Sequence, residues 1–177
     1  MNKLAMKHLI IIALVFTTFS CAKAQNKKNT KSTKQETTTF YFVRHAEKDT
    51  KPKNNPKLLP SGKARANTLA NFFKNIKLDA IYSTDFTRTL NTVLPTAKSQ
   101  KLNTKIYDPV AMNYNTFKSN NIGKNVFIVG HSNTIPNFVN AIIGEKIYPE
   151  IDETNYNNLY IVTITNTGIK HELRTKY

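Results

Sequence analysis

The feature that most constrains this chain is a short apolar run that ends in a basic pair. Residues 40–43 read Phe-Tyr-Phe-Val, and Arg44 and His45 follow at once. Such a run predicts a short buried strand. In open α/β sheets, ligands bind beyond the carboxyl ends of the strands, so we expect Arg44 and His45 to lie at a ligand-binding rim of the sheet.

A second strand of the same design follows about ninety residues later. Residues 125–130 form an apolar run that ends in a glycine, and His131 comes directly after it. The apolar residues between positions 135 and 143 then recur at helical spacing. If the two strands are parallel, His45 and His131 lie at the same edge of the sheet.

The remaining segments alternate between predicted helices and strands. Ser61 is the expected N-cap of a helix that ends near residue 75, and Thr84 or Asp85 is the expected cap of the next helix. Pro95 is expected to bend or end that second helix. A strand is predicted over 79–83, an edge strand with its turn over 104–109, a short helix over 115–120, and a hairpin over 158–176.

Three short blocks carry a resemblance to a known family. They are Arg44–Glu47, Tyr82–Thr89 and Gly130–Ser132, each at the end of a predicted strand. Together they resemble the signature blocks of the histidine phosphatase (phosphoglycerate mutase-like) superfamily, over residues 38–177. Ala46 stands where that family more often has glycine. The same change to alanine is found in the short bacterial members of the family. The resemblance implies an α/β three-layer sandwich, in which helices flank a mostly parallel central sheet with a C-terminal antiparallel hairpin.

The same resemblance implies a phosphatase that needs no metal and no cofactor. His45 would be the nucleophile, and Arg44, Arg88, His131 and Ser132 would bind the phosphate. The substrates would be phosphomonoesters or phosphohistidine, carried by a small molecule or by a phosphoprotein. The sequence pattern by itself does not distinguish His45 from His131 as the nucleophile, because both follow apolar strands.

The residue types suit this chemistry. A phosphoryl group in transit spreads negative charge over three oxygens, and the arginine fork binds such oxygens in pairs without losing its charge. Arg88 also falls in the first turn of a predicted helix, where unpaired N–H groups favour an anion. A metal site is the alternative for these residues, with His45, Glu47, His131 and Asp108 as ligands. Their spacing matches no metal-binding motif, and two arginines at that rim would repel a cation. The alternative function is a catalytically idle lipoprotein that binds an anionic ligand.

The proton donor to the leaving group is a separate assignment. Asp108 follows a predicted strand and precedes Pro109, which suits a position at the pocket rim. Glu47 is nearer the nucleophile in the sequence and is the second candidate. We favour Asp108, and we expect Arg65 to be a surface or supporting group.

The N-terminal segment has the layout of an export signal. Residues 1–20 place two lysines before an apolar run, which is typical of a signal peptide. We favour lipidation at Cys21 over cleavage after Ala24, because Cys21 is the single cysteine of the chain. Residues 21–38 would then be a flexible tether, and residues 39–177 a phosphatase domain on the periplasmic side, anchored to the membrane by lipid.

The charge of the chain does not favour nucleic acid as a partner. The formal net charge is +15, but seven of the 26 basic residues and one of the 11 acidic residues precede position 38. The domain therefore keeps a net charge of +9, spread as scattered lysines without an arginine-rich stripe. A basic domain of this kind suits anionic substrates.

Overall fold

The computed structural model describes residues 36–51 and 54–177. The predicted signal peptide, Cys21 and the tether up to residue 35 lie outside these residues. The first strand begins at Thr38.

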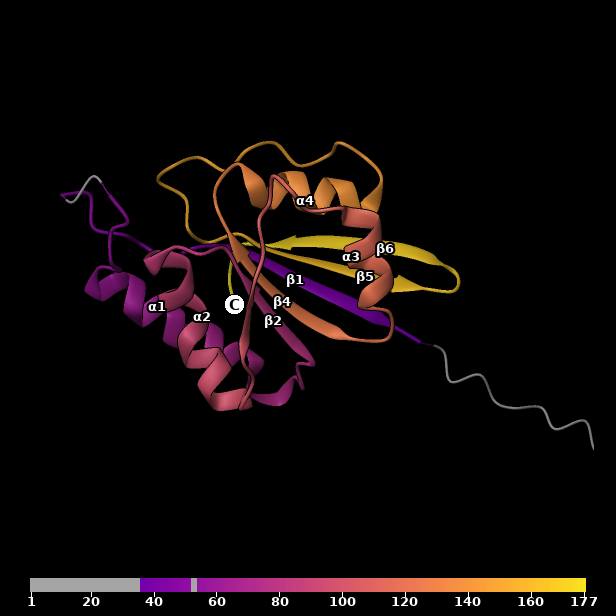
Figure 1. The fold of residues 1–177 in the computed structure, drawn as a ribbon, viewed down its shortest axis with the longest axis horizontal. Coiled ribbons are helices and arrows are strands. Elements are labelled where there is room, and N and C mark those ends of the chain that lie inside the picture. The colour runs from indigo at the N-terminus through magenta and orange to yellow at the C-terminus, as the bar shows by residue number, and fades with distance from the viewer. Residues whose placement is uncertain (1–35, 52–53) are drawn as a thin grey trace, which may run out of the picture. The chain divides into compact units, whose positions relative to one another are not determined.

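A six-stranded mixed sheet forms the centre of the domain (Figure 1). The strands are β1 (Thr38–Arg44), β2 (Ala80–Ser83), β3 (Thr104–Ile106), β4 (Asn125–Gly130), β5 (Leu159–Thr165) and β6 (Gly168–Arg174). Their order is β3-β2-β4-β1-β5-β6; the first four are parallel, while β5 and β6 form an antiparallel hairpin beside β1. The predicted α/β fold with a mostly parallel sheet and a C-terminal hairpin is confirmed.

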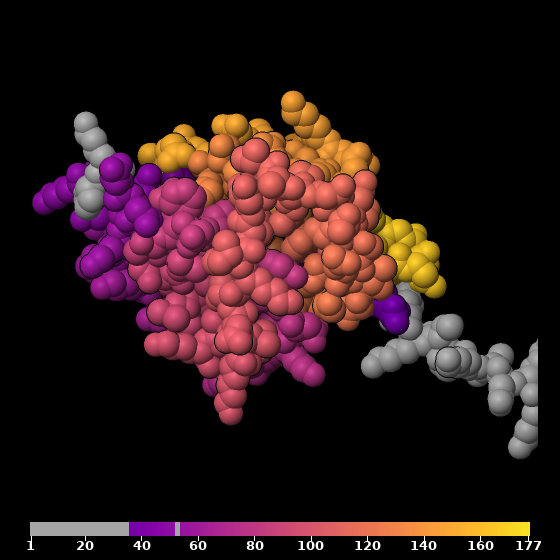
Figure 2. Space-filling model, viewed as in Figure 1, coloured from indigo at the N-terminus to yellow at the C-terminus, as the bar shows by residue number. Residues whose placement is uncertain are grey.

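Helices cover both faces of this sheet. They are α1 (Pro60–Phe72), the short 3-10 helix η1 (Phe73–Asn75), α2 (Thr87–Gln100), α3 (Tyr114–Asn120) and α4 (Thr134–Ile143). Figure 1 shows α1 and α2 on one side of the sheet and α3 and α4 on the other. In Figure 2 the viewed surface consists mainly of the segment from α2 to α4, and the yellow hairpin emerges at one edge.

The core has one layer on each face because side chains alternate along β1. Phe40 and Phe42 pack on the α3–α4 side, where Phe138 of α4 lies edge-on to Phe42 at 5.1 Å. Tyr41 and Val43 pack on the α1–α2 side. The central strand is thus buried on both faces, as a continuous apolar run predicts.

The predicted N-cap of α1, Ser61, is wrong. The N-cap is Leu59, no side chain caps the helix, and Pro60 is its first residue. The N–H of Leu59 donates instead to the carbonyl of Glu47 at 2.9 Å, so a contact with the loop after β1 fixes the start of the helix. Proline suits this first position because it has no N–H to leave unpaired.

The predicted caps of α2 are also wrong. The N-cap is Phe86, and the N–H of Thr87 donates at 2.7 Å to the side chain of Asn55, which comes from the distant loop after β1. Pro95 does not end this helix, which continues to Gln100. Val93 and Ala97 on either side of Pro95 are buried against the sheet, and this packing keeps the helix continuous past the missing hydrogen bond.

The parallel strands bring their carboxyl ends to one edge of the sheet. Arg44 at the end of β1 pairs in register with Gly130 at the end of β4, and β2 ends beside β4 at Ser83. The segments after these three strands carry His45, Thr84 and His131. No helix in residues 36–51 or 54–177 is long and apolar enough to cross a membrane.

Candidate active site

The two predicted histidines lie against each other at this edge. The N–H of His45 donates to the carbonyl of Gly130 at 2.9 Å, which ties the end of β1 to the residue before His131. The two imidazole rings are edge to face, with centroids 5.6 Å apart. The parallel pairing of β1 and β4 therefore brings the histidines together, as the sequence predicts.

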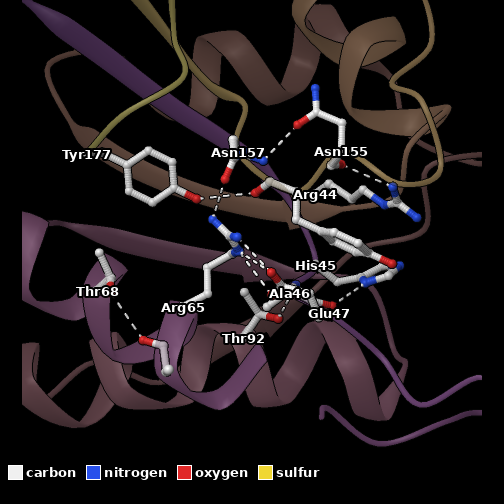
Figure 3. Close-up of polar contacts among 12 residues, drawn as sticks. Arg44, His45, Ala46, Glu47, Arg65, Thr68, Thr92, Asn155, Asn157 and Tyr177 are labelled. Carbon is white, nitrogen blue, oxygen red and sulfur yellow. Dashed lines mark hydrogen bonds and ion pairs between the residues drawn. The ribbon is translucent and has the colours of Figure 1, made fainter. Parts of the chain in front are cut away.

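A backbone contact fixes the tautomer of His45. Its Nδ1 lies 2.8 Å from the carbonyl oxygen of Ala46, and because that oxygen can only accept, Nδ1 carries the proton (Figure 3). Burial, followed by the nearby charges of Arg44 and Arg88, lowers the pKa of His45 to about 3. His45 is only 3% exposed. It is thus a neutral imidazole whose Nε2 holds an unshared electron pair.

His131 has partners at both ring nitrogens. Arg88 Nη2 lies 3.3 Å from Nδ1, and since an arginine only donates, Nδ1 accepts and Nε2 carries the proton. Nε2 then donates to the hydroxyl of Thr84 at 3.0 Å, and Thr84 donates onward to Thr89 at 3.1 Å. Burial, with help from Arg88 and Arg44, lowers the pKa of His131 to about 4. Of the two histidines, His45 is therefore the one with a nitrogen free to attack.

Arg88 reaches the site from the first turn of α2, as predicted. Its guanidinium carbon lies 4.4 Å from the centre of the Phe86 ring, which supports it from one side. Its Nε is buried and has no acceptor among the described residues. A buried donor without an acceptor costs about 1–3 kcal/mol, and an oxyanion beside the guanidinium would remove that cost.

Arg44 is held from the opposite side by the loop between α4 and β5. Its Nη1 lies within 2.9–3.1 Å of the carbonyl oxygens of Asp152, Glu153 and Asn155. The guanidinium carbon lies 4.3 Å from the centre of the Tyr156 ring. Arg44 is 3% exposed, and its Nε has no acceptor among the described residues. The loop thus fixes the guanidinium in place.

His45, Arg88 and His131 open onto a pocket of about 340 Å³. Its lining consists of His45, Lys48, Arg88, His131, Ser132, Asn133, Glu150 and Glu153. The pocket combines fixed cations with a neutral imidazole nitrogen. That combination suits a small anion that is attacked by a nucleophile.

The two candidate proton donors lie differently. The Glu47 carboxylate pairs with Arg65, with an Nη2–Oε1 distance of 2.6 Å, and Arg65 Nη1 donates to Asn157 at 2.8 Å (Figure 3). Burial is the largest single influence on the pKa of Glu47 and raises it, but the hydrogen bond and charge of Arg65, with a backbone hydrogen bond, together lower this pKa. Glu47 and Arg65 line a separate pocket of about 480 Å³ that contains neither histidine.

Asp108 does not line the pocket that contains the histidines. Its carboxylate accepts a hydrogen bond of 2.8 Å from the N–H of Val110, within its own turn. In the structure His45, Arg88, His131 and Ser132 line that pocket, and Arg44 lies behind the lining residue Glu153, to which it is hydrogen-bonded. Asp108 is not part of this lining. Arg65 is a supporting group, as expected.

Several residues of the site escaped the sequence analysis. Thr84 was expected as a helix cap, yet its hydroxyl accepts from His131. Thr92 accepts from the N–H of Ala46 at 2.9 Å. Glu153 and Tyr156 come from a loop without periodicity, so no pattern marked them. Lys48 directly follows the block Arg44–Glu47, and this position in the sequence is the signal that could have identified it as a site residue. In the described part of the chain, no group of three His, Cys, Asp or Glu side chains is placed to hold a metal ion.

Comparisons with known proteins bear on the family and the fold. The model of the histidine phosphatase superfamily (branch 1) matches residues 40–111. No curated protein sequence matches the chain significantly.

Solved structures share the fold. The protein histidine phosphatase SixA complexed with tungstate has a TM-score of 0.63 and 11% identity, over 77% of this chain and 96% of that one. A candidate SixA phosphohistidine phosphatase from Agrobacterium tumefaciens has a TM-score of 0.57 and 18% identity, over 77% and 97%. A mycobacterial glucosyl-3-phosphoglycerate phosphatase with VO3 has a TM-score of 0.60 and 10% identity, over 77% and 97%.

These structures are similar to the chain in fold. The family match covers two of the three signature blocks, Arg44–Glu47 and Tyr82–Thr89, and the fold brings the third block beside them. Over residues 40–111 the chain is similar to the histidine phosphatase superfamily, branch 1, and solved phosphatases of the SixA type share its fold.

Proposed function

We propose that this protein is a metal-independent phosphatase that hydrolyses phosphomonoesters or phosphohistidine through a phosphohistidine intermediate on His45. The observation that carries the proposal is the buried, neutral His45, whose Nδ1 proton is held by Ala46 and whose Nε2 has no hydrogen-bond partner among the described residues. The match to the family model and the guanidinium groups of Arg44 and Arg88 at the same edge, whose Nε atoms are buried, support it.

In the first step, the Nε2 electron pair of His45 forms a bond to phosphorus while the bond from phosphorus to the leaving oxygen or nitrogen breaks. Arg44 and Arg88 stabilise the charge on the phosphoryl oxygens, and Ser132 offers a further hydrogen bond. The Nδ1–H of His45 stays on the Ala46 carbonyl, which holds the ring in the attacking tautomer. The leaving atom takes a proton as it departs.

In the second step, water attacks the phosphorus of the phosphohistidine. The P–N bond breaks, inorganic phosphate forms, and His45 recovers its neutral Nε2. His131 is hydrogen-bonded at both nitrogens, so in this mechanism it orients Arg88 through Nδ1. It is not the nucleophile.

The test is the turnover of p-nitrophenyl phosphate by the purified protein. We expect activity that survives EDTA, and a loss of about 10³-fold or more in kcat for His45→Ala. Enzyme quenched in base during turnover should carry a phosphate that is base-stable and acid-labile, and His45→Ala should carry none. Restoration of chelated enzyme by zinc or manganese would contradict the proposal. Tungstate binding without turnover of any phosphate ester would support the idle, anion-binding lipoprotein instead.

We also propose, from the sequence alone, that the protein is exported and anchored by lipid at Cys21 on the periplasmic side. Fractionation of cells that express the full chain tests this. The Cys21→Ser variant should move from the membrane fraction to the soluble fraction or remain unprocessed. A mature protein that begins at Gln25 would show cleavage after Ala24 and contradict the anchor.

A further inference from the structure

The pocket contains a carboxylate that belongs to the protein itself. Glu153 Oε2 lies 2.5 Å from Arg44 Nη2, and its Oε1 accepts a hydrogen bond from the Ser132 hydroxyl. One carboxylate therefore bridges two donors that come from the ends of neighbouring strands. The hydrogen bond from Ser132 is the first cause that lowers the pKa of Glu153, and the charge of Arg44 also lowers it, so the group is an anion at neutral pH.

Arg44 and Ser132 are also two of the groups that the proposed reaction assigns to the phosphate. A carboxylate oxygen and a phosphoryl oxygen accept hydrogen bonds from the same donors, since both are charged acceptors. A dianionic phosphoryl group and the Glu153 carboxylate would repel each other if both stayed on Arg44. Glu150 adds a second negative charge to the pocket lining, and Lys48 and Arg88 add positive ones.

The two sides of this ion pair differ in freedom. The Arg44 side chain is 2% exposed and is fixed by three carbonyl oxygens and the Tyr156 ring, whereas the Glu153 side chain is 69% exposed. Glu153 can therefore swing into solvent without breaking any packing, while Arg44 keeps its place. The exposed carboxylate is the partner that can be exchanged.

We propose that Glu153 occupies the anion position between Arg44 and Ser132 in the free protein, and that a phosphoryl oxygen takes this position when substrate binds. This inference rests on the proposed function, because it assigns Arg44 and Ser132 to the phosphate. Glu153 is then a residue that sets the affinity of the site for oxyanions. A ligand must interact with Arg44 more strongly than a carboxylate does, which favours dianionic phosphoryl groups.

Calorimetric titration of the full-length protein with tungstate at pH 7 tests the exchange. Glu153→Gln removes the competing charge, so we expect tungstate to bind about fivefold more tightly or better, as for the loss of an ion pair worth about 1 kcal/mol. Glu150→Gln is the matched control, because it removes one negative charge from the same lining without touching Arg44 or Ser132. Equal gains in the two variants, or no gain in Glu153→Gln, would overturn the proposal.

A crystal structure of the tungstate complex gives the second readout. We expect Arg44 Nη2 and Ser132 Oγ on tungstate oxygens, with the Glu153 carboxylate turned into solvent. Tungstate bound in the pocket with Glu153 still on both donors would refute the exchange, even if the protein hydrolyses phosphate esters. Exchange of Glu153 by tungstate in a protein without turnover would instead leave this inference intact and refute the proposed function.

Discussion

The hydroxyl of Thr92 on α2 links the loop of the candidate nucleophile to the helix of Arg88. It accepts a hydrogen bond of 2.9 Å from the N–H of Ala46 (Figure 3). It also donates one of 2.7 Å to the carbonyl of Arg88. The Ala46 carbonyl in turn accepts from His45. One side chain in the helix thus holds the N–H of Ala46, the residue whose carbonyl sets the tautomer of the nucleophile.

Thr92→Val should therefore destabilise the protein and lower its kcat. The near-isosteric valine leaves the N–H of Ala46 buried without an acceptor, which costs about 1–3 kcal/mol in the free energy of unfolding. We expect a lower kcat as well, because the Ala46 peptide is freer to rotate. Thr96→Val is the matched control one turn later: the Thr96 hydroxyl is buried without a partner, so a methyl group there should be neutral or stabilising. Urea unfolding and initial rates measure both, and equal losses in the two variants would contradict this role of Thr92.

The packing of Gly62 beneath the same loop gives a second prediction. A Cβ built on Gly62 would lie 2.2 Å from the carbonyl oxygen of Glu47, which is backbone and cannot turn aside. Alanine normally favours a helix over glycine by about 1 kcal/mol. We nevertheless expect Gly62→Ala to destabilise the protein by about 1–3 kcal/mol, because the clash outweighs the propensity.

The neighbouring Ser61→Ala is the control for that variant. Ser61 was the expected N-cap, but no side chain caps α1, so its hydroxyl contributes no cap. We expect a change of about 0.5 kcal/mol or less in the free energy of unfolding. A loss of about 1 kcal/mol, which is usual for a capping serine, would restore the cap predicted from sequence.

The sequence predicted the parts of the site that follow from strand pairing. Arg44, His45 and His131 were located because apolar runs are local signals and parallel strands end at one edge. The helix caps failed for a tertiary reason: the hydroxyl of Thr84 is taken by His131, and the start of α1 is fixed by the Glu47 carbonyl. No local pattern encodes such contacts.

The loop over Arg44 was beyond prediction for the same reason. Glu153 meets Arg44 across 109 positions of sequence, from a segment without helix or strand period. Its acidic residues looked like those of an ordinary solvated loop. The contact exists only because β5 returns antiparallel beside β1, which carries the preceding loop across the carboxyl end of β1.

The two buried histidines predict how stability depends on pH. Burial lowers the pKa of His45 to about 3 and that of His131 to about 4, against about 6.5 in an unfolded chain. Below pH 6.5 the unfolded chain therefore binds more protons than the folded protein, so stability is complete above that pH and falls as the pH decreases. Each histidine contributes about 1.4 kcal/mol per pH unit in this window.

Urea unfolding at pH 7.5 and pH 5 measures this linkage. We expect the loss of stability between the two pH values to be smaller in His45→Asn than in the wild type by about 2 kcal/mol. The exposed His171 on β6 provides the control, and His171→Asn should show the same loss as the wild type. Equal losses in all three proteins would mean that His45 is protonated in the folded state at pH 5.

The proton donor is tested by changing the leaving group. A general acid matters most when the leaving group is an alkoxide of high pKa and least for p-nitrophenolate, which departs without help. If Asp108 is the donor, Asp108→Asn should lower kcat on an alkyl phosphate by ~10²–10⁴-fold and spare the aryl ester.

Because the Asp108 carboxylate accepts from the N–H of Val110 and lies outside the pocket lining, we expect Asp108→Asn to cause small and similar losses of kcat on both esters. Glu47→Gln should also affect the two esters equally, since its carboxylate faces Arg65. A selective loss on the alkyl ester in Asp108→Asn would instead confirm the assignment made from sequence, and it would require the turn at Asp108 to move toward the pocket when substrate binds.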